Sequence, residues 1–203
     1  MTYVLENIGL IARLFGEHLA LTFSALAIAL TIALPLGVLV ARVKWLRGPV
    51  LGVLGTLYTI PTLSLFVLLI PILGLGTGPA LTALVIYAQV VLVRNVVIGL
   101  DGIDPGVIES ARGMGMSQVQ RLLRVELPLA LPLILAGVRV VTLSTIGIGT
   151  LAAFVNAGGL GTLLFDGVRS GNNEKIVIGA LAVSLLAVAA NGLFGLVERR
   201  AAI

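Results

Sequence analysis

The chain has 203 residues, of which 59% are hydrophobic and only 11% are charged, and its net charge is +4. In soluble domains about a quarter of the residues are charged, so this composition excludes a soluble domain. It predicts an all-α membrane protein, a polytopic bundle of transmembrane helices. With no cysteine and one histidine, we expect no disulfide, no metal and no cofactor. The basic residues are dispersed between apolar runs, which favours a topology signal over a nucleic-acid surface.

Residues 1–18 are mildly polar and predict a helix lying along the membrane interface, with His18 as an interface residue. They lack a basic n-region, so we expect no cleaved signal peptide. The uncharged run 19–41 is long enough to cross a hydrocarbon core about 30 Å thick. Arg42 and Lys44 follow it, and this charge bias places the N-terminus outside the cell and the next loop in the cytoplasm.

Two further crossings are predicted in the long uncharged stretch that follows, at about 49–73 and 80–100, separated by a glycine-rich break. Pro61 interrupts the first of them and leaves a backbone carbonyl without its helical partner. Two interpretations stay open: a kink that serves packing, or a helix that lines a polar path through the bundle. In the second case the candidates for lining the path are Tyr58, Thr59, Pro61, Thr62 and Ser64.

The one long polar interval of the chain lies between the third and fourth predicted spans, in the cytoplasm by the same charge count. Asp104 is placed to cap a short helix, which Gly113 ends and after which Gly115 permits a sharp turn. Ser117 and Gln120 have the spacing of a capping box that starts a second helix. We therefore predict a helix–turn–helix elbow over residues 101–126, outside the bilayer.

The last two spans are predicted at about 127–153 and 176–197. Arg139 lies within the fourth span, where an arginine is costly in lipid, so it should face protein or water. It is interpreted either as part of a structural ion pair or as a residue of the path or of a dimer interface. Further candidates for the path are Asn95, Ser144 and Thr145.

Glycines dominate the external segment after the fourth span, where the candidate loop residues are Asn156, Gly158, Gly159 and Gly161. Such a backbone bends tightly, but without a following lysine it is no phosphate-binding loop. Residues 162–175 are predicted to be polar and external, and Arg199 and Arg200 place the C-terminus in the cytoplasm. Eight Lys and Arg residues then lie inside and three outside, which supports five spans with the N-terminus outside.

The elbow carries a spaced motif: Glu109-Ser110-Ala111, Gly115, Val125 and Leu127-Pro128. It resembles the EAA loop of ABC importer permeases, with Ser for the second-position Ala and Val for Ile. The segments YTIPTLSLF (58–66), GIDPGVIESARGMGM (102–116), ELPLALPLILAGVR (126–139) and NAGGLG (156–161) together resemble the permease subunit of osmoprotectant importers. Those importers move glycine betaine, carnitine and choline. The five-span layout is also similar to the methionine-importer permease.

This resemblance implies a type I importer with a second permease copy or sibling, two cytoplasmic ATP-binding subunits and an extracytoplasmic solute-binding protein. The elbow would be the coupling helix that docks into a cleft of the ATPase. Ala111 would fit that cleft because it is small, and Glu109 would orient the elbow through a local hydrogen bond or ion pair. The coupling residues implied are Val107, Ile108, Glu109, Ser110, Ala111, Arg112, Gly113, Gly115, Ser117 and Gln120.

Neither lysine of the chain follows a glycine-rich frame, so the chain has no ATP site of the P-loop type. No nucleophile–histidine set or acid–base pair is present either, and we expect a transport subunit whose ATP is hydrolysed by a partner. Two alternatives stay open: an ABC permease for amino acids such as methionine, and a channel or scaffold membrane protein without an ATPase.

Overall fold

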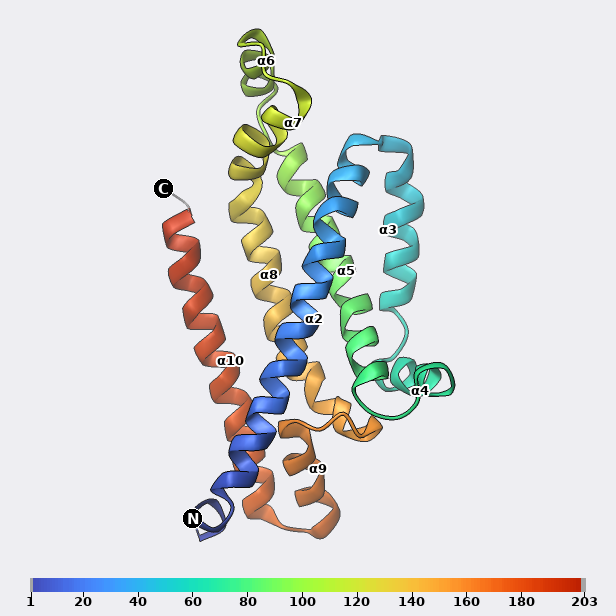
Figure 1. The fold of residues 1–203 in the computed structure, drawn as a ribbon, viewed down its shortest axis with the longest axis vertical. Helices are drawn as coiled ribbons and strands as arrows, with labels where there is room; N and C mark the ends of the chain where they lie inside the picture. The colour runs from blue at the N-terminus through green and yellow to red at the C-terminus, as the bar shows by residue number, and fades with distance from the viewer. Residues whose placement is uncertain (1, 202–203) are drawn as a thin grey trace.

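The computed structural model describes the backbone of residues 2–201 and the side chains of residues 3–198. The side chains of Arg199 and Arg200, which enter the charge count, lie outside that part. Across the described chain every regular element is a helix, which confirms the all-α class (Figure 1). In chain order these are α1 (Thr2–Glu6), α2 (Ile8–Arg42), α3 (Lys44–Tyr58), α4 (Thr62–Leu73), α5 (Thr77–Asp101), α6 (Pro105–Gly113), α7 (Gln118–Arg121), a π-helical turn (Leu122–Glu126), α8 (Leu127–Gly149), a 3-10 turn (Thr150–Val155), α9 (Leu160–Ser170) and α10 (Asn173–Ala201).

Four helical stretches of the described chain are long and apolar enough to cross a membrane: Ile8–Arg42, Thr77–Asp101, Gln118–Val155 and Asn173–Glu198. A fifth crossing requires α3 and α4 to act together, because a break bends them by 97°. The prediction of a membrane bundle is confirmed. The second span, predicted at about 49–73 with an interruption at Pro61, corresponds to this bent pair, whose bend is much sharper than a kink.

The break between α3 and α4 lies at Pro61, the residue predicted to interrupt the span. Pro61 has ψ 135°, an extended conformation that ends the helical path. The hydroxyl of Tyr87 on α5 donates a hydrogen bond to the carbonyl of Ile60, a group that the break removes from helical pairing. Beyond it, α4 turns across the foot of α3 (Figure 1), and its Leu65 and Phe66 are buried against α5.

The N-terminal segment 1–18 does not form one helix of its own: after the short α1 (Thr2–Glu6), it continues into the first span. Residues 8–18 belong to the same 35-residue helix as the first predicted span. Leu14 is buried against α9, and His18 is 0% exposed, so the placement of His18 at the interface is wrong. The physical reason is the glycine-rich chain beside it, since Gly149 and Gly159 leave room for the imidazole ring.

Helix α5 lies at the centre of the bundle and packs against α2 and α8. Glycines allow these helices to come close together. A Cβ atom at Gly37 of α2 would lie 2.6 Å from Val96 of α5, and one at Gly137 of α8 would lie 2.8 Å from Asn95. Small residues at crossings are the usual means of packing helices in membranes, where lipid removes the hydrophobic driving force between helices.

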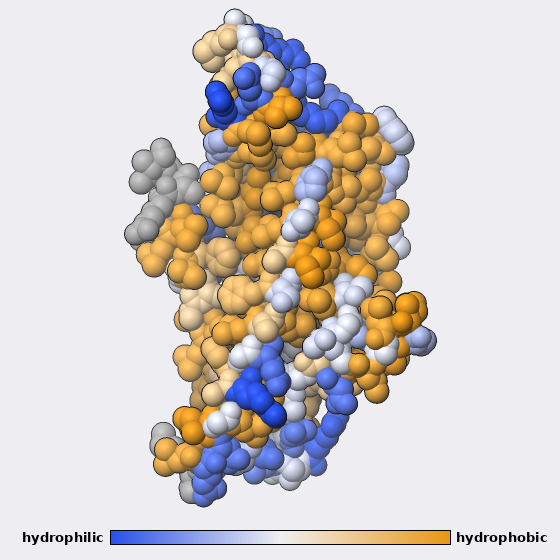
Figure 2. Space-filling view, viewed as in Figure 1, coloured by the Kyte–Doolittle hydropathy of each residue, from blue (hydrophilic) through white to orange (hydrophobic). Residues whose placement is uncertain are grey.

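The surface between the two polar ends of the molecule is apolar (Figure 2). None of the residues of α3 is buried, and only 6% of the most apolar window of α10 is buried. These helices therefore offer their apolar side chains to the surrounding membrane or to another subunit.

The segment 162–175, predicted to be polar and external, contains most of the helix α9, an element that the sequence analysis did not anticipate. Its helix α9 packs on α10 with Leu160 and Leu163 buried. At Gly167 a Cβ atom would lie 2.8 Å from the backbone nitrogen of Ile176, so the two helices meet at close range. The polar residues of the segment occupy one face of the helix, and its apolar face closes this end of the bundle.

Candidate functional site: the elbow and the tyrosine pocket

The predicted elbow is present and projects beyond α5 and α8 at one end of the molecule (Figure 1). Asp104 caps α6 as expected, because its Oδ1 accepts a hydrogen bond of 2.6 Å from the backbone of Gly106. Helix α6 ends at Gly113, and Gly115 has φ +77°, a conformation that favours glycine. The turn therefore depends on the glycine that the sequence singled out.

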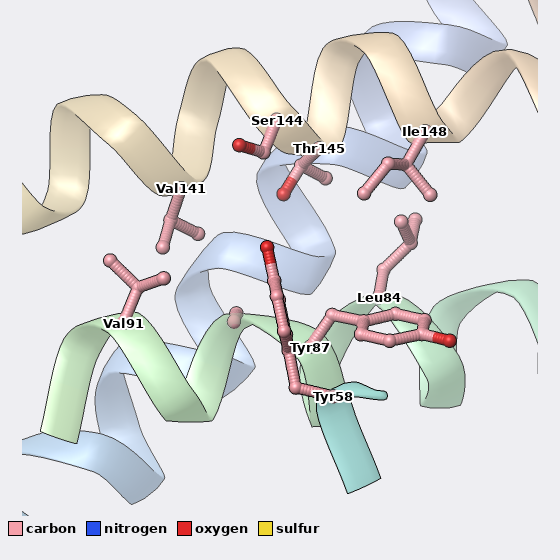
Figure 3. A pocket seen from close by; sticks show the side chains of 9 residues that line it. Tyr58, Leu84, Tyr87, Val91, Val141, Ser144, Thr145 and Ile148 are labelled. Carbon is pink, nitrogen blue, oxygen red and sulfur yellow. The ribbon is translucent and has the colours of Figure 1, made fainter. Parts of the chain in front are cut away.

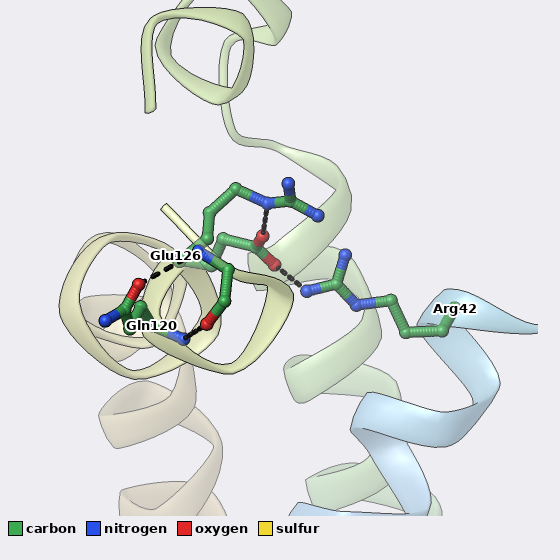
Figure 4. Close-up of polar contacts among 5 residues, drawn as sticks. Arg42, Gln120 and Glu126 are labelled. Atoms are coloured by element: carbon green, nitrogen blue, oxygen red, sulfur yellow. Dashed lines mark hydrogen bonds and ion pairs between the residues drawn. The ribbon is translucent and has the colours of Figure 1, made fainter. Parts of the chain in front are cut away.

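The second arm of the elbow starts with the predicted capping box (Figure 4). The hydroxyl of Ser117 accepts from the backbone of Gln120 at 3.3 Å, and the Gln120 side chain accepts from the backbone of Ser117 at 2.9 Å. This arm continues through the π-helical turn into α8 without a break. The elbow is therefore an extension of the fourth span rather than a loop that ends before it.

Most of the predicted coupling residues are exposed, but Ala111 is not. Ala111 is 2% exposed, and its carbonyl accepts the backbone N–H of Met116, so in this structure its side chain packs inside the turn and is not open to a partner. Glu109, expected to orient the elbow through a local contact, has an exposed side chain with no hydrogen bond or ion pair among the described residues. Met114 and Val119, which sequence reasoning missed, are 73% and 65% exposed. They could have been identified from the sequence, because both are large apolar residues in an otherwise polar interval.

A buried ion cluster joins the elbow to the bundle (Figure 4). Glu126 lies 2.7 Å from Nε of Arg121, and Arg42 at the end of α2 donates to its other carboxylate oxygen. Arg121 and Glu126 side chains are each 5% exposed, whereas the Arg42 side chain is 39% exposed. π-Helical turns are rare and frequently mark functional sites. The sequence did not predict the cluster, because charged residues in a polar interval are usually exposed to solvent.

Three of the predicted path residues meet in one pocket, together with a tyrosine that sequence reasoning missed (Figure 3). Tyr58 at the end of α3 stands between α5 and α8 with its hydroxyl directed toward Ser144 and Thr145. Its ring lies edge-to-face with that of Tyr87, with centroids 5.6 Å apart. The cavity itself is small, about 20 Å³, which is room for about one water molecule. Aromatic residues that look scattered in the sequence thus form a pair.

The remaining path candidates lie elsewhere. Thr59 donates to the carbonyl of Thr56 at 2.7 Å, and Ser64 is exposed on α4. Asn95 donates to the carbonyl of Val91 at 2.8 Å and packs at the α5–α8 crossing. These side chains satisfy local backbone groups or face outward, so the structure does not gather them around the tyrosine pair.

Arg139 forms a structural ion pair, the first of its two interpretations. Its Nη1 lies 2.7 Å from Glu198, and its Nε donates to Asn191 at 2.8 Å. Both partners are on α10, and the three side chains therefore hold α10 against α8.

The glycine loop receives the outer part of α2. The backbone N–H of Gly159 donates to Glu17 at 3.0 Å, and a Cβ atom at Gly158 would lie 2.4 Å from the same carboxylate. The ring nitrogen Nε2 of His18 lies 3.1 Å from the carbonyl of Ile146. Asn156 and Gly158–Gly159 have positive φ, which turns the backbone toward α2. Sequence reasoning missed Glu17 and His18, although the glycines that accommodate them were identified.

Comparison with known proteins gives the family. The family model described as "Binding-protein-dependent transport system inner membrane component" matches residues 33–203. The osmoprotectant import permease protein OsmW of Salmonella typhimurium is 44% identical over 191 residues, which cover 92% of this chain and 89% of that protein. The glycine betaine/carnitine/choline transport system permease protein OpuCB of Bacillus subtilis is 36% identical, covering 98% of this chain and 92% of its own length.

The fold agrees with these relatives. A chain of the MetNI methionine ABC transporter, solved in inward-facing conformations, superposes with a TM-score of 0.88 at 25% identity, covering 97% of this chain and 98% of that one. The chain therefore belongs to the family of binding-protein-dependent transport system inner membrane components, and it is a multi-pass permease subunit of an ABC importer.

Proposed function

We propose that this permease imports quaternary ammonium osmoprotectants such as glycine betaine, choline or carnitine. It works with two cytoplasmic ATP-binding subunits, an extracytoplasmic solute-binding protein and a second permease, either an identical copy or a sibling. The proposal rests mainly on the elbow, an exposed helical projection whose base contains the buried Arg121–Glu126 ion pair. The names of the relatives, which include carriers of glycine betaine, carnitine and choline, supply the solute class.

The surface of the elbow suits an ATPase contact. Val107, Met114 and Val119 are large apolar residues that are 39%, 73% and 65% exposed on a polar projection. Apolar side chains that solvent would disfavour are typical of the centre of a protein interface. Movement of the ATPase subunits would displace the elbow, and the uninterrupted helix from Gln118 would carry the displacement into the bundle.

The side chains that line the tyrosine pocket suit a cationic solute, although the cavity in this structure has room for about one water molecule and would have to widen to admit the solute. Tyr58 and Tyr87 present aromatic rings, whose faces attract quaternary ammonium groups by about 0.5–2 kcal/mol. Ser144 and Thr145 add hydroxyl groups that suit a carboxylate or an alcohol. The pocket contains no charged residue in its lining, so a positively charged solute meets no fixed counter-ion that would hold it tightly. Weak binding of this kind suits a translocation path, where the solute must leave again, rather than a high-affinity binding site.

We further propose that the elbow is cytoplasmic and the N-terminus extracytoplasmic. Arg42, Lys44 and Arg112 lie at the elbow end together with Arg121 and Arg124, which agrees with the positive-inside rule. Because the chain has no cysteine, Met114→Cys at the elbow and Val168→Cys on α9 can be labelled singly in intact cells. A membrane-impermeant maleimide should react with the Val168→Cys protein alone. Labelling of Met114→Cys from outside would refute the orientation and with it the coupling role.

Uptake in the native host tests the function itself. Deleting the gene should abolish uptake of at least one of glycine betaine, choline and carnitine, and the intact gene should restore it. Loss of methionine uptake alone would favour the amino-acid importer. The tagged permease should copurify with an ATPase subunit that hydrolyses ATP; a chain purified without one would instead support a channel or scaffold.

A further inference from the structure

A long apolar groove runs between the second half of α2 and the start of α8, on the face shown in Figure 2. Its volume is about 670 Å³, and it is open to the surroundings of the bundle. Aliphatic side chains line both walls, and its charged lining residue is Arg42. The groove is separate from the tyrosine pocket, with which it shares no lining residue.

The groove follows from helical spacing on both walls. Leu34, Val38 and Leu39 lie on one side of α2, while Leu127 and Leu131 lie one turn apart on α8. Leu34, Leu39 and Leu131 are 36%, 48% and 41% exposed, so the walls are open to the outside of the bundle. The two walls contact each other deeper in the bundle, where Ile134 is buried, so the groove is a shallow apolar trough on the surface that faces the membrane.

The elbow end of the groove carries a surplus positive charge. Glu126 contributes one negative charge, which Arg121 and Arg42 share, so the three side chains retain a net charge of +1. This net positive charge is accessible at Arg42, because the side chains of Arg121 and Glu126 are each 5% exposed whereas that of Arg42 is 39% exposed. Nη1 of Arg42 has no partner among the described side chains, and the exposed Lys44 follows two positions later.

We propose that this groove binds one anionic phospholipid, with an acyl chain between α2 and α8 and its phosphate at Arg42. The chemistry of the occupant is read from the two ends of the groove: an apolar trough at membrane depth requires hydrocarbon, and an unsatisfied cation at its mouth requires an anion. A phospholipid supplies both in one molecule, and basic pockets between membrane helices bind such headgroups. The bound lipid positions Arg42. Because Arg42 also contacts Glu126, the lipid stabilises the base of the elbow. The proposal requires a membrane protein but neither a particular solute nor an ATPase.

Native mass spectrometry of the purified permease tests the site, with phosphatidylglycerol and phosphatidylcholine of identical acyl chains as the probes. The wild type should retain one phosphatidylglycerol in preference to phosphatidylcholine. Arg42→Gln should weaken phosphatidylglycerol binding about fivefold, the value of one cation near a membrane surface. It leaves the Arg121–Glu126 pair in place. Arg169→Gln, which removes an exposed cation at the opposite end, should have no effect.

A second pair of variants tests the trough without altering charge. Leu131→Trp fills the groove and should abolish retention of both lipids, whereas Val53→Trp on the open surface of α3 should retain them. Equal retention of the two lipids by the wild type, or undiminished binding in both Arg42→Gln and Leu131→Trp, would overturn the proposal. So would a change of oligomeric state in Leu131→Trp with lipid binding intact, because a second copy of the chain would then occupy the groove. Lipid retention is measured without solute or ATP, so failure of the import function leaves this test unaffected.

Discussion

Nε of Arg121 lies 2.7 Å from Oε1 of Glu126, and neither side chain is more than 5% exposed. The two residues are five positions apart: Arg121 directly precedes the π-helical turn and Glu126 is its last residue, where the elbow becomes the fourth span. Arg42 reaches the same carboxylate from α2. A single buried acid thus connects the elbow with two membrane helices, and we expect the elbow to be rigid at its base.

Removing the charge of Glu126 should destabilise the protein. Glu126→Gln leaves Arg121 buried without a counter-charge, and breaking a buried ion pair in this way costs about 3–5 kcal/mol. We expect a clearly lower melting temperature in detergent. Glu109→Gln changes an exposed carboxylate of the same elbow and should melt like the wild type. Equal melting of the two variants would show that the cluster contributes nothing to the fold.

Gly115 should be required for coupling. Its φ of +77° costs a residue with a side chain about 1–2 kcal/mol, so Gly115→Ala should distort the turn between α6 and α7. In the assembled importer we expect solute-stimulated ATP hydrolysis to fall while the complex stays intact. Gly192→Ala on α10 is the control outside the elbow, because Gly192 has no positive φ and a Cβ atom there would meet nothing within 4 Å. Full activity of Gly115→Ala would contradict the coupling role.

Gly161 should tolerate no side chain. A Cβ atom there would lie 1.9 Å from the carbonyl oxygen of Thr150, a backbone atom that cannot rotate away. We expect Gly161→Ala to lose about 1–3 kcal/mol of stability or more, the range for overpacked sites. Gly147→Ala, in a helix with open space around it, should be neutral or stabilising. Thermal unfolding of the two variants in the same detergent compares them directly.

Arg139 and Glu198 should show strong coupling. Arg139→Met leaves Glu198 without its cation, whereas the double variant Arg139→Met/Glu198→Met replaces the pair by apolar groups. The double variant should therefore be more stable than the Arg139→Met single variant, because an unpaired acid is costlier than no acid. A double-mutant cycle on thermal stability measures the coupling. The exposed pair Arg169–Asp166, at 4.0 Å, should give almost none.

Tyr58 should affect solute affinity through its ring. Tyr58→Leu removes a cation–π contact of about 0.5–1 kcal/mol and should raise the KM for a quaternary ammonium solute about two- to fivefold. Tyr58→Phe keeps the ring and should retain most of the affinity. An identical KM for all three proteins would exclude the tyrosine pair from the path.

Local patterns predicted local structure well. The capping box of Ser117 and Gln120 depends on residues three positions apart, and it is present as expected. The turn at Gly115 and the interruption at Pro61 are of the same kind. The bend of 97° was not predictable, because its direction depends on Tyr87, which lies 27 residues away from Ile60.

Buried polar groups were the main failures, for a related reason. His18 and Glu126 occupy polar stretches that solvent normally surrounds, and only their distant partners place them inside. Periodicity along one helix cannot reveal a partner on another. The tyrosine pair was missed in the same way, since Tyr58 and Tyr87 come from different helices.

The stretch Gln118–Val155 is helical over 38 residues, which corresponds to about 55 Å of length. One of its ends starts at the capping box of Ser117, and the other leads directly into the backbone that receives Glu17. One continuous helical stretch thus joins the two ends of the bundle, without a break like the one at Pro61. A tilt of the elbow end of this helix would therefore move its far end, beside Glu17, in the opposite direction.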